Sequence, residues 1–333
     1  MSSSKGKGKE PAILPPLPGP SSGSANPAAS LSALWAYLLP ALNHIVKSPT
    51  NNSDKAPAID IGFYAGIHTA CYNYFTSQSE NKSSTPRAAG EPAITSGTDL
   101  YQQLDKYFME AAREVMLGAP QDDSTLIHYI VPCFNRFSAG AMSINRLLNY
   151  VNRHYVKRAI DEDKGWLRLN DVLESVAKTI TADDSREKIS GRLKEKRTDE
   201  LKKWGYKIDG SGASMASAEA CAEAASPPDR IVSVSSLAHR RFRLEVFDPL
   251  LAVPVVKGKK AKNKIPKAAG KSTPAPIPKG RLARAVKELL ESKGGDEEER
   301  TRLITDLAAG LRLVGVRPDH PLRKRLDKFL ASA

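Results

Sequence analysis

The residues best suited to chemistry lie together in the stretch YAGIHTACYNYFTS, residues 64–77. His68 and Cys71 are three residues apart, so their side chains share a face if this stretch is helical. A thiol beside an imidazole is a pairing used in nucleophilic catalysis, which also needs an orienting third group and an oxyanion hole. Neither accompanies this stretch, so packing explains the pair better than catalysis.

Sequence motifs of the common enzyme classes are absent. The chain has no GxxxxGKS/T, no GxGxxG after a strand, no GxSxG and no HExxH. Its six histidines lack metal-ligand spacing, and its odd number of cysteines (Cys71, Cys133 and Cys221) forms neither a zinc motif nor a disulfide framework. We therefore predict that the chain is not an enzyme, takes no cofactor or metal, and resides in a reducing compartment.

Residues 59–77 are predicted to form a helix with apolar or aromatic side chains on two faces. One apolar stripe at helical spacing holds Phe63, Ile67, Ala70 and Tyr74, and a second stripe holds Tyr64, His68, Cys71 and Tyr72. A helix that is apolar or aromatic on two faces lies either at the centre of its domain or between a core and an interface. The tyrosine cluster is thus either core packing or half of a docking surface.

The remaining pattern predicts an all-α protein of about five to eight helices with long disordered insertions. Residues 1–29 are rich in Ser, Gly and Pro and predict a disordered tail. Residues 30–333 predict one helical domain, interrupted by insertions at about 78–97, 165–229 and 252–280, of which the second combines a highly charged helical stretch at 166–207 with a linker at 209–229. No apolar run is long enough for a membrane span, and the first residues lack the apolar segment of a signal peptide.

The net charge of +13 comes mostly from one segment. Residues 257–287 contain eleven Lys or Arg and no acid, which leaves the rest of the chain near neutral. The densest part is a basic patch of Lys257, Lys259, Lys260, Lys262 and Lys264, which is typical of a nuclear localisation signal, so we expect both cytoplasm and nucleus. An alternative function is non-specific, salt-sensitive binding of nucleic acid or chromatin through this segment, although a solvated loop explains the segment better because it lacks interleaved aromatic residues for base stacking.

Several collinear blocks resemble the cullin family. LWAYLLPALNHI fits the first helix of a cullin repeat, and YNYFTS after Tyr64 resembles the second. GTDLYQQLDKYF is similar to the third helix, and NYVNRHYVKRAIDEDKG to the family pattern Y-L-N-R-x-W-x-x-R-x-x-D-E-x-x-K. Residues 231–250, IVSVSSLAHRRFRLEVFDPL, resemble the fifth helix, with Phe242 at the usual Trp, and residues 283–316 continue the likeness.

The resemblance implies a single cullin repeat that acts as a non-catalytic module. Cullins are scaffolds of multi-subunit ubiquitin ligases, in which the first repeat docks a BTB-fold adaptor that brings an F-box or similar receptor. The likeness ends near the close of the first repeat, so the RING-binding region of the family is expected to be missing. We expect a role in ubiquitin-dependent protein catabolism, with an adaptor protein as partner and neither a membrane nor a small molecule.

The resemblance also implies which residues would meet the adaptor. In the family this surface is formed by the second and fifth helices. Carried over by position, the candidates are Tyr64, Ile67, His68, Cys71, Val232 and Ser235. Val232 and Ser235 stand where the family has two tyrosines, and the insertion at 165–229 directly precedes them, so the expected docking positions differ from the family more than the core positions do.

Overall fold

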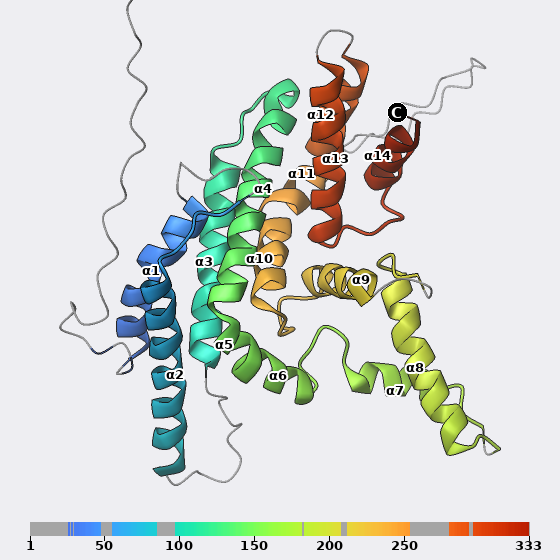
Figure 1. Cartoon of the computed structure of the whole chain (residues 1–333). Coiled ribbons are helices and arrows are strands. Elements are labelled where there is room, and N and C mark those ends of the chain that lie inside the picture. Colours follow the sequence, from blue (N-terminus) through green and yellow to red (C-terminus); the bar gives the residue numbers. More distant parts are fainter. Residues whose placement is uncertain are drawn as a thin grey trace, which may run out of the picture.

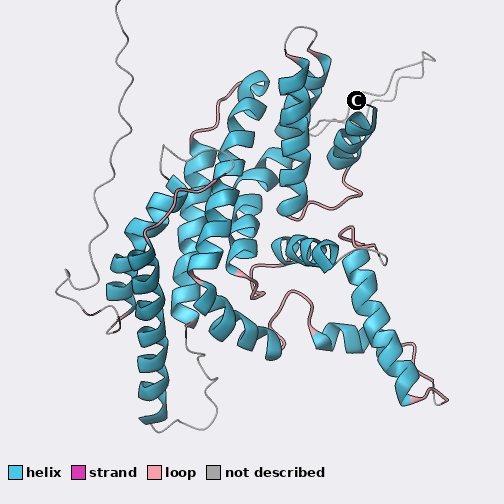
Figure 2. Cartoon of the chain, viewed as in Figure 1, coloured by secondary structure: helices cyan, strands magenta, loops and turns pink. Residues whose placement is uncertain are grey.

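The computed structural model describes residues 26, 28, 30–47, 55–84, 97–181, 183–207, 212–253, 280–292 and 296–332. Throughout these residues the regular structure is helical and contains no β-strand, as Figure 2 shows, which confirms the predicted all-α class. None of the helices in the described ranges has the length and hydropathy needed to cross a bilayer.

The helices fall into an N-terminal, a middle and a C-terminal group. The first contains α1 (Leu31–Lys47), α2 (Ile61–Ser84), α3 (Thr98–Leu117) and α4 (Asp123–Leu147). After α4 the chain continues through α5 (Asn149–Val151), the π-helical turn η1 (Asn152–Val156) and α6 (Lys157–Asp161). The middle group is α7 (Leu169–Ala177), α8 (Arg186–Lys202) and α9 (Gly212–Ala225). The last is α10 (Val234–Phe242), the π-helical turn η2 (Arg243–Phe247), α11 (Asp248–Leu251), α12 (Arg281–Glu291), α13 (Glu297–Leu313) and α14 (Pro321–Ser332).

The long helix α4 organises the bundle. It contacts α1 and α2 on one side and α12 and α13 on the other (Figure 1). At the centre it contacts α10, which also packs on α3. Helix α2 packs on α1, α4 and α5, and α9 joins α10 to α13. The aromatic helix α2 is therefore at the edge of the bundle, and among the described helices none covers its outer face.

The core between α4 and α10 is aromatic. Phe242 is fully buried, with its ring centroid 5.0 Å from those of Phe134 and Phe137 and 5.3 Å from that of Phe247. These separations and tilted arrangements are the ones that aromatic pairs prefer. The sequence pattern predicts that Leu237, Phe242 and Phe247 face inward, and the burial of all three confirms this prediction.

Hydrogen bonds to main-chain atoms fix the start of α10. The hydroxyl of Tyr101 donates to the carbonyl oxygen of Val232 at 2.9 Å and accepts from its amide at 3.1 Å. The Oδ1 atoms of Asn152 and Asn145 accept from the first amides of α10, those of Val234 and Ser235, at 3.1 Å. These side chains satisfy amides that a helix start leaves free, so the start of α10 is held against α3 and the end of α4.

The segment 165–229 is ordered into helices: α7 and α8 confirm the charged helical stretch predicted at 166–207, whereas α9 shows that the prediction of a linker at 209–229 is wrong. It contains the three helices α7, α8 and α9, which raises the helix number above the five to eight expected. The stretch 209–229 looks like a linker because it is rich in small residues, yet alanine has the highest helix propensity. In α9 the side chains of Ala218, Cys221, Ala222 and Ala224 are buried. Of the other predicted insertions, residues 78–84 complete α2, and 85–96 and 254–279 lie outside the described residues, as does nearly all of the tail 1–29.

A buried arginine fastens the end of this middle group to α10. Arg240 is 1% exposed, and its NH1 donates to Ser226 Oγ at 3.3 Å and to the carbonyl oxygens of Pro227 and Arg230 at 2.9 and 2.8 Å. On the opposite side of α9, a Cβ at Gly315 would lie 2.6 Å from the main chain of Cys221 and Ala225. Glycine has no Cβ and so permits this close approach, and the φ of +80° at Gly315 lies in the left-handed region that glycine adopts readily.

The buried histidine of α10 makes stability depend on pH. His239 is enclosed between α10 and α4, its Nε2 lies 2.9 Å from Ser138 Oγ, and desolvation lowers its pKa to about 4. The unfolded chain takes up a proton near pH 6.5, so this stability is complete above 6.5 and is lost as pH falls towards 4. We expect His239 to reduce the free energy of unfolding by about 2 kcal/mol between pH 7 and pH 5.

The measurement is urea unfolding of the full chain and of His239→Gln at both pH values. Glutamine can keep a hydrogen bond to Ser138 but does not titrate, so the variant should lose less stability than the original chain. Other groups titrate in the same range, so the contribution of His239 is the difference between the stability losses of the two proteins. Equal losses in both would show that His239 is not responsible.

Candidate docking surface

Helix α2 has one buried and one exposed aromatic face. Asp60 Oδ1 accepts from the amides of Gly62 and Phe63 at 2.8 and 3.2 Å and so begins the helix. Phe63, Ile67, Ala70 and Tyr74 are buried, which confirms the first predicted stripe. On the other side Tyr64 and Tyr72 are 41% and 50% exposed, with the exposed His68 between them.

The residues of the second stripe differ in burial, which their spacing in the sequence does not predict. Cys71 is 1% exposed, and burial raises the pKa of its thiol to about 12, so the thiol stays protonated at neutral pH. His68 faces solvent instead. The pair therefore lacks an activated nucleophile: Cys71 belongs to the core, as the packing interpretation expects, and His68 belongs to the surface.

Three of the six predicted docking residues do not reach the surface. Ile67, Cys71 and Val232 are 0%, 1% and 0% exposed, so their side chains cannot form a contact surface in this structure. Val232 is drawn into the core by the two hydrogen bonds with Tyr101. The prediction for these three positions is wrong because spacing along a helix does not reveal which neighbours cover it.

The two helices from which the resemblance draws the docking surface, here α2 and α10, have different main packing partners. Helix α10 packs mainly on α3, α4 and α9, whereas α2 packs on α1, α4 and α5. Ser235 is half-buried at the start of α10, where its amide donates to Asn145. The residues that flank the exposed face of α2 come instead from the end of α4 and from the α5–η1 turn.

The residue that sequence reasoning missed is Tyr150. Its ring centroid lies 5.6 Å from that of His68, 5.9 Å from Tyr72 and 5.2 Å from Phe75, each edge to face. It stacks on the ring of His154 at 4.1 Å. The stretch NYVNRHY contains both aromatic residues and could have indicated a surface site, but by sequence it suggests a structural joint. Tyr64, His68, Tyr72, Tyr150 and His154 together form what we call the aromatic strip.

A groove opens beside the aromatic strip. The hydroxyl of Tyr64 donates to the carbonyl oxygen of Arg146 at 3.2 Å and so bridges α2 to the end of α4. Between these helices and the preceding loop lies a hollow of about 640 Å³. Its lining is Lys55, Ala56, Pro57, Ala58, Ile59, Tyr64, Ala139, Met142, Ser143, Arg146 and Leu147. Apolar walls with a few polar groups are typical of binding sites.

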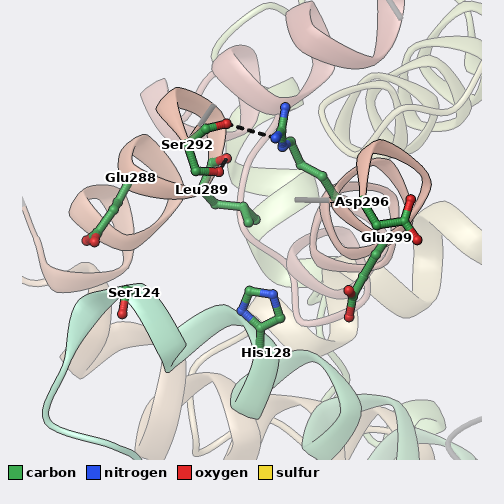
Figure 3. Close-up of a pocket in the computed structure, with 8 residues that line it drawn as sticks. Ser124, His128, Glu288, Leu289, Ser292, Asp296 and Glu299 are labelled. Atoms are coloured by element: carbon green, nitrogen blue, oxygen red, sulfur yellow. Dashed lines mark hydrogen bonds between the residues drawn. The ribbon is translucent and has the colours of Figure 1, made fainter. Parts of the chain in front are cut away.

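A second hollow, of about 230 Å³, lies between the start of α4 and the α12–α13 pair (Figure 3). His128 lies beside Glu299 at this hollow, whose lining also includes Glu288, Asp296 and Arg300. Within the described ranges, no group of three or more His, Cys, Asp or Glu residues is arranged to hold a metal ion. This acidic hollow therefore gives no support for a metal centre.

The predicted basic patch, Lys257, Lys259, Lys260, Lys262 and Lys264, lies outside the described residues. The described end of the basic segment is part of the bundle. Arg281 and Arg284 pair with Asp123 at 3.1 and 2.8 Å, and Lys287 pairs with Glu291 at 3.5 Å. These three cations already have carboxylate partners, so the fold supplies no free basic surface there.

Two known proteins connect part of the chain to cullins. It is 26% identical to Cell division control protein 53 of Saccharomyces cerevisiae over 141 residues, which are 40% of this chain and 17% of that protein. It is 27% identical to Cullin-1 of Dictyostelium discoideum over 105 residues, which are 30% of this chain and 14% of that protein. Part of this chain is cullin-like in sequence.

The cullin-like match spans about a sixth of the length of these relatives. No protein-family model and no solved structure matches the chain. The fold and surface described above therefore rest on the geometry of the chain itself.

Proposed function

We propose that this chain is a non-catalytic, cullin-like interaction module that docks a BTB-fold adaptor of the F-box type within a ubiquitin ligase complex. The proposed role is in ubiquitin-dependent protein catabolism, in the cytoplasm and the nucleus. The partial similarity to cullins supports a scaffold role in such complexes. The observation that carries the docking site is the aromatic strip, which remains exposed on α2 and α5–η1 after the bundle has packed.

The chemistry of the aromatic strip suits protein recognition better than catalysis. Tyr64 and Tyr72 present apolar rings with polar ends, and such amphipathic side chains are enriched at protein interfaces. Ring contacts hold Tyr150 against His68 and Tyr72, so the strip is ordered before a partner arrives. A preordered surface loses less side-chain entropy on binding.

The test is to titrate the full chain with a purified F-box-type adaptor by calorimetry. We expect a 1:1 complex with a Kd of about 1 µM or below. Replacing both exposed tyrosines in Tyr64→Ser/Tyr72→Ser should weaken binding by about 30-fold or more, because interface tyrosines are frequent hot spots. The matched control is Leu117→Ser, which changes a side chain that is 85% exposed at the end of α3.

No complex at tens of micromolar would contradict adaptor binding. A complex that tolerates the tyrosine substitutions would leave adaptor binding intact but would place it elsewhere on the chain.

A further inference from the structure

The groove beside the aromatic strip contains several apolar side chains. Its floor and walls include the side chains of Ile59, Met142 and Leu147, and Met142 is 51% exposed. At about 640 Å³ the groove is large enough for one or two apolar side chains of a partner. Methionine is unbranched and adapts to different shapes, so it suits a recognition surface. The groove is therefore built for apolar contact.

The charged residues at the groove are all positive. Lys55 and Arg146 both line it and are exposed, and no acidic residue lines it. Neither side chain forms an ion pair within the part of the chain that the structure describes. Asp60 follows the lining loop, but its carboxylate is occupied by the first amides of α2. The groove therefore carries two cations that lack a counter-charge.

The same sign continues along the edge of the aromatic strip. Arg153 and Lys157 follow Tyr150 by three and seven residues, and both are exposed. Within the described ranges neither has a carboxylate partner, whereas the neighbouring Arg158 pairs with Glu162 at 3.1 Å. Among the side chains of α2 that the structure describes, residues 61–79, the face that presents Tyr64, His68 and Tyr72 contains no acidic residue. Arg146, Arg153 and Lys157 form the basic edge of the strip.

We propose that this groove and the basic edge bind an acidic segment of a partner protein. One apolar side chain of that segment fills the groove against Met142 and Ile59, and flanking carboxylates pair with Lys55 and Arg146. This inference rests on the proposed function, because the same surface docks the adaptor, and it adds the chemistry of the bound segment. The aliphatic side chains of the groove (Ile59, Met142 and Leu147) favour an apolar side chain of a peptide, whereas single-stranded nucleic acid stacks its bases on aromatic rings.

The charge arrangement sets how the complex responds to salt. The four cations (Lys55, Arg146, Arg153 and Lys157) are exposed, so their attraction for carboxylates acts mainly during encounter and is screened by salt. We expect the association rate to fall by about tenfold between about 50 mM and about 500 mM salt. The dissociation rate, which depends on the apolar contact, should change much less.

The experiment uses two probes on the full chain. One is the F-box-type adaptor, and the other is a fluorescein-labelled eight-residue peptide of alternating glutamate and leucine. We expect Lys55→Glu/Arg146→Glu to weaken both interactions by about tenfold or more. Met142→Glu, which puts a charge in the groove, should do the same. The matched control is Lys324→Glu/Lys328→Glu, which reverses two exposed charges on the distant helix α14.

The outcomes separate this inference from the proposed function. If the acidic peptide binds and the adaptor does not, the acidic groove stands and the proposed function fails. If the adaptor binds equally well to the charge-reversed chain, docking stands and the acidic groove is overturned. The inference also fails if the peptide with lysine in place of glutamate binds equally well, if neither probe binds, or if a single-stranded oligonucleotide displaces the glutamate peptide from the groove.

Discussion

Replacement of Phe242 by alanine is expected to lower the free energy of unfolding by about 4 kcal/mol. Phe242 is fully buried where α10 crosses α4, and its ring meets those of Phe134, Phe137 and Phe247 within 5.3 Å. Alanine removes the apolar transfer energy of the ring and leaves a cavity that rigid neighbours fill only in part. Aromatic pairing with three neighbours adds a further contribution.

The measurement is urea unfolding followed by circular dichroism, with Phe242→Leu and Tyr72→Ala beside Phe242→Ala. Leucine keeps part of the buried volume and should cost roughly half as much. Tyr72 is 50% exposed, so its replacement should change stability by about 1 kcal/mol or less. A loss below about 1 kcal/mol for Phe242→Ala would mean that the α4–α10 core is not packed as described.

Replacement of Tyr150 by alanine is expected to weaken adaptor binding by about 100-fold. Tyr150 contacts His68, Tyr72 and His154, so its removal takes away one contact residue and the support of three others. Because it is only half-buried, the loss in folding stability should remain about 1 to 2 kcal/mol. Binding should therefore suffer more than folding.

The decisive comparison is Tyr150→Phe. The described residues place the ring of Tyr150, rather than its hydroxyl, in contact with the strip, so phenylalanine should retain most of the affinity. Affinity is measured by calorimetry with the F-box-type adaptor, and folding by thermal unfolding of each variant. If the alanine variant binds as well as the original chain, Tyr150 does not belong to the docking surface.

The two faces of α2 show how far a sequence can be interpreted. The buried stripe through Phe63, Ile67, Ala70 and Tyr74 follows from helical spacing and is confirmed. Cys71 belongs by spacing to the other stripe, yet it is buried. Periodicity reports how side chains are distributed around one helix. It does not report how wide an angle the neighbouring helices cover.

The middle group of helices shows a different limit. Its low hydrophobicity and many charges predict an insertion, and a single charged helix such as α8 buries little apolar area of its own. The segment orders through specific contacts, in which Arg240 holds the 226–230 loop and Gly315 meets the end of α9. Both partners lie outside the segment 165–229, Arg240 within 14 residues of the loop that it binds and Gly315 much farther along the chain, so the composition of the segment contains no record of them.

The sequence by itself determined the helical class, the inward residues of α2 and α10, and the richness of residues 64–77 in amphipathic rings. Each of these follows from local spacing and composition, which act over one or two helical turns. Only the tertiary structure decided that the ring of Tyr150 on α5 lies beside His68 and Tyr72 of α2. The reason is physical: Tyr101, Asn145 and Asn152 fix the start of α10 against α3 and α4, and the ring of Tyr150 then takes the place beside His68 and Tyr72.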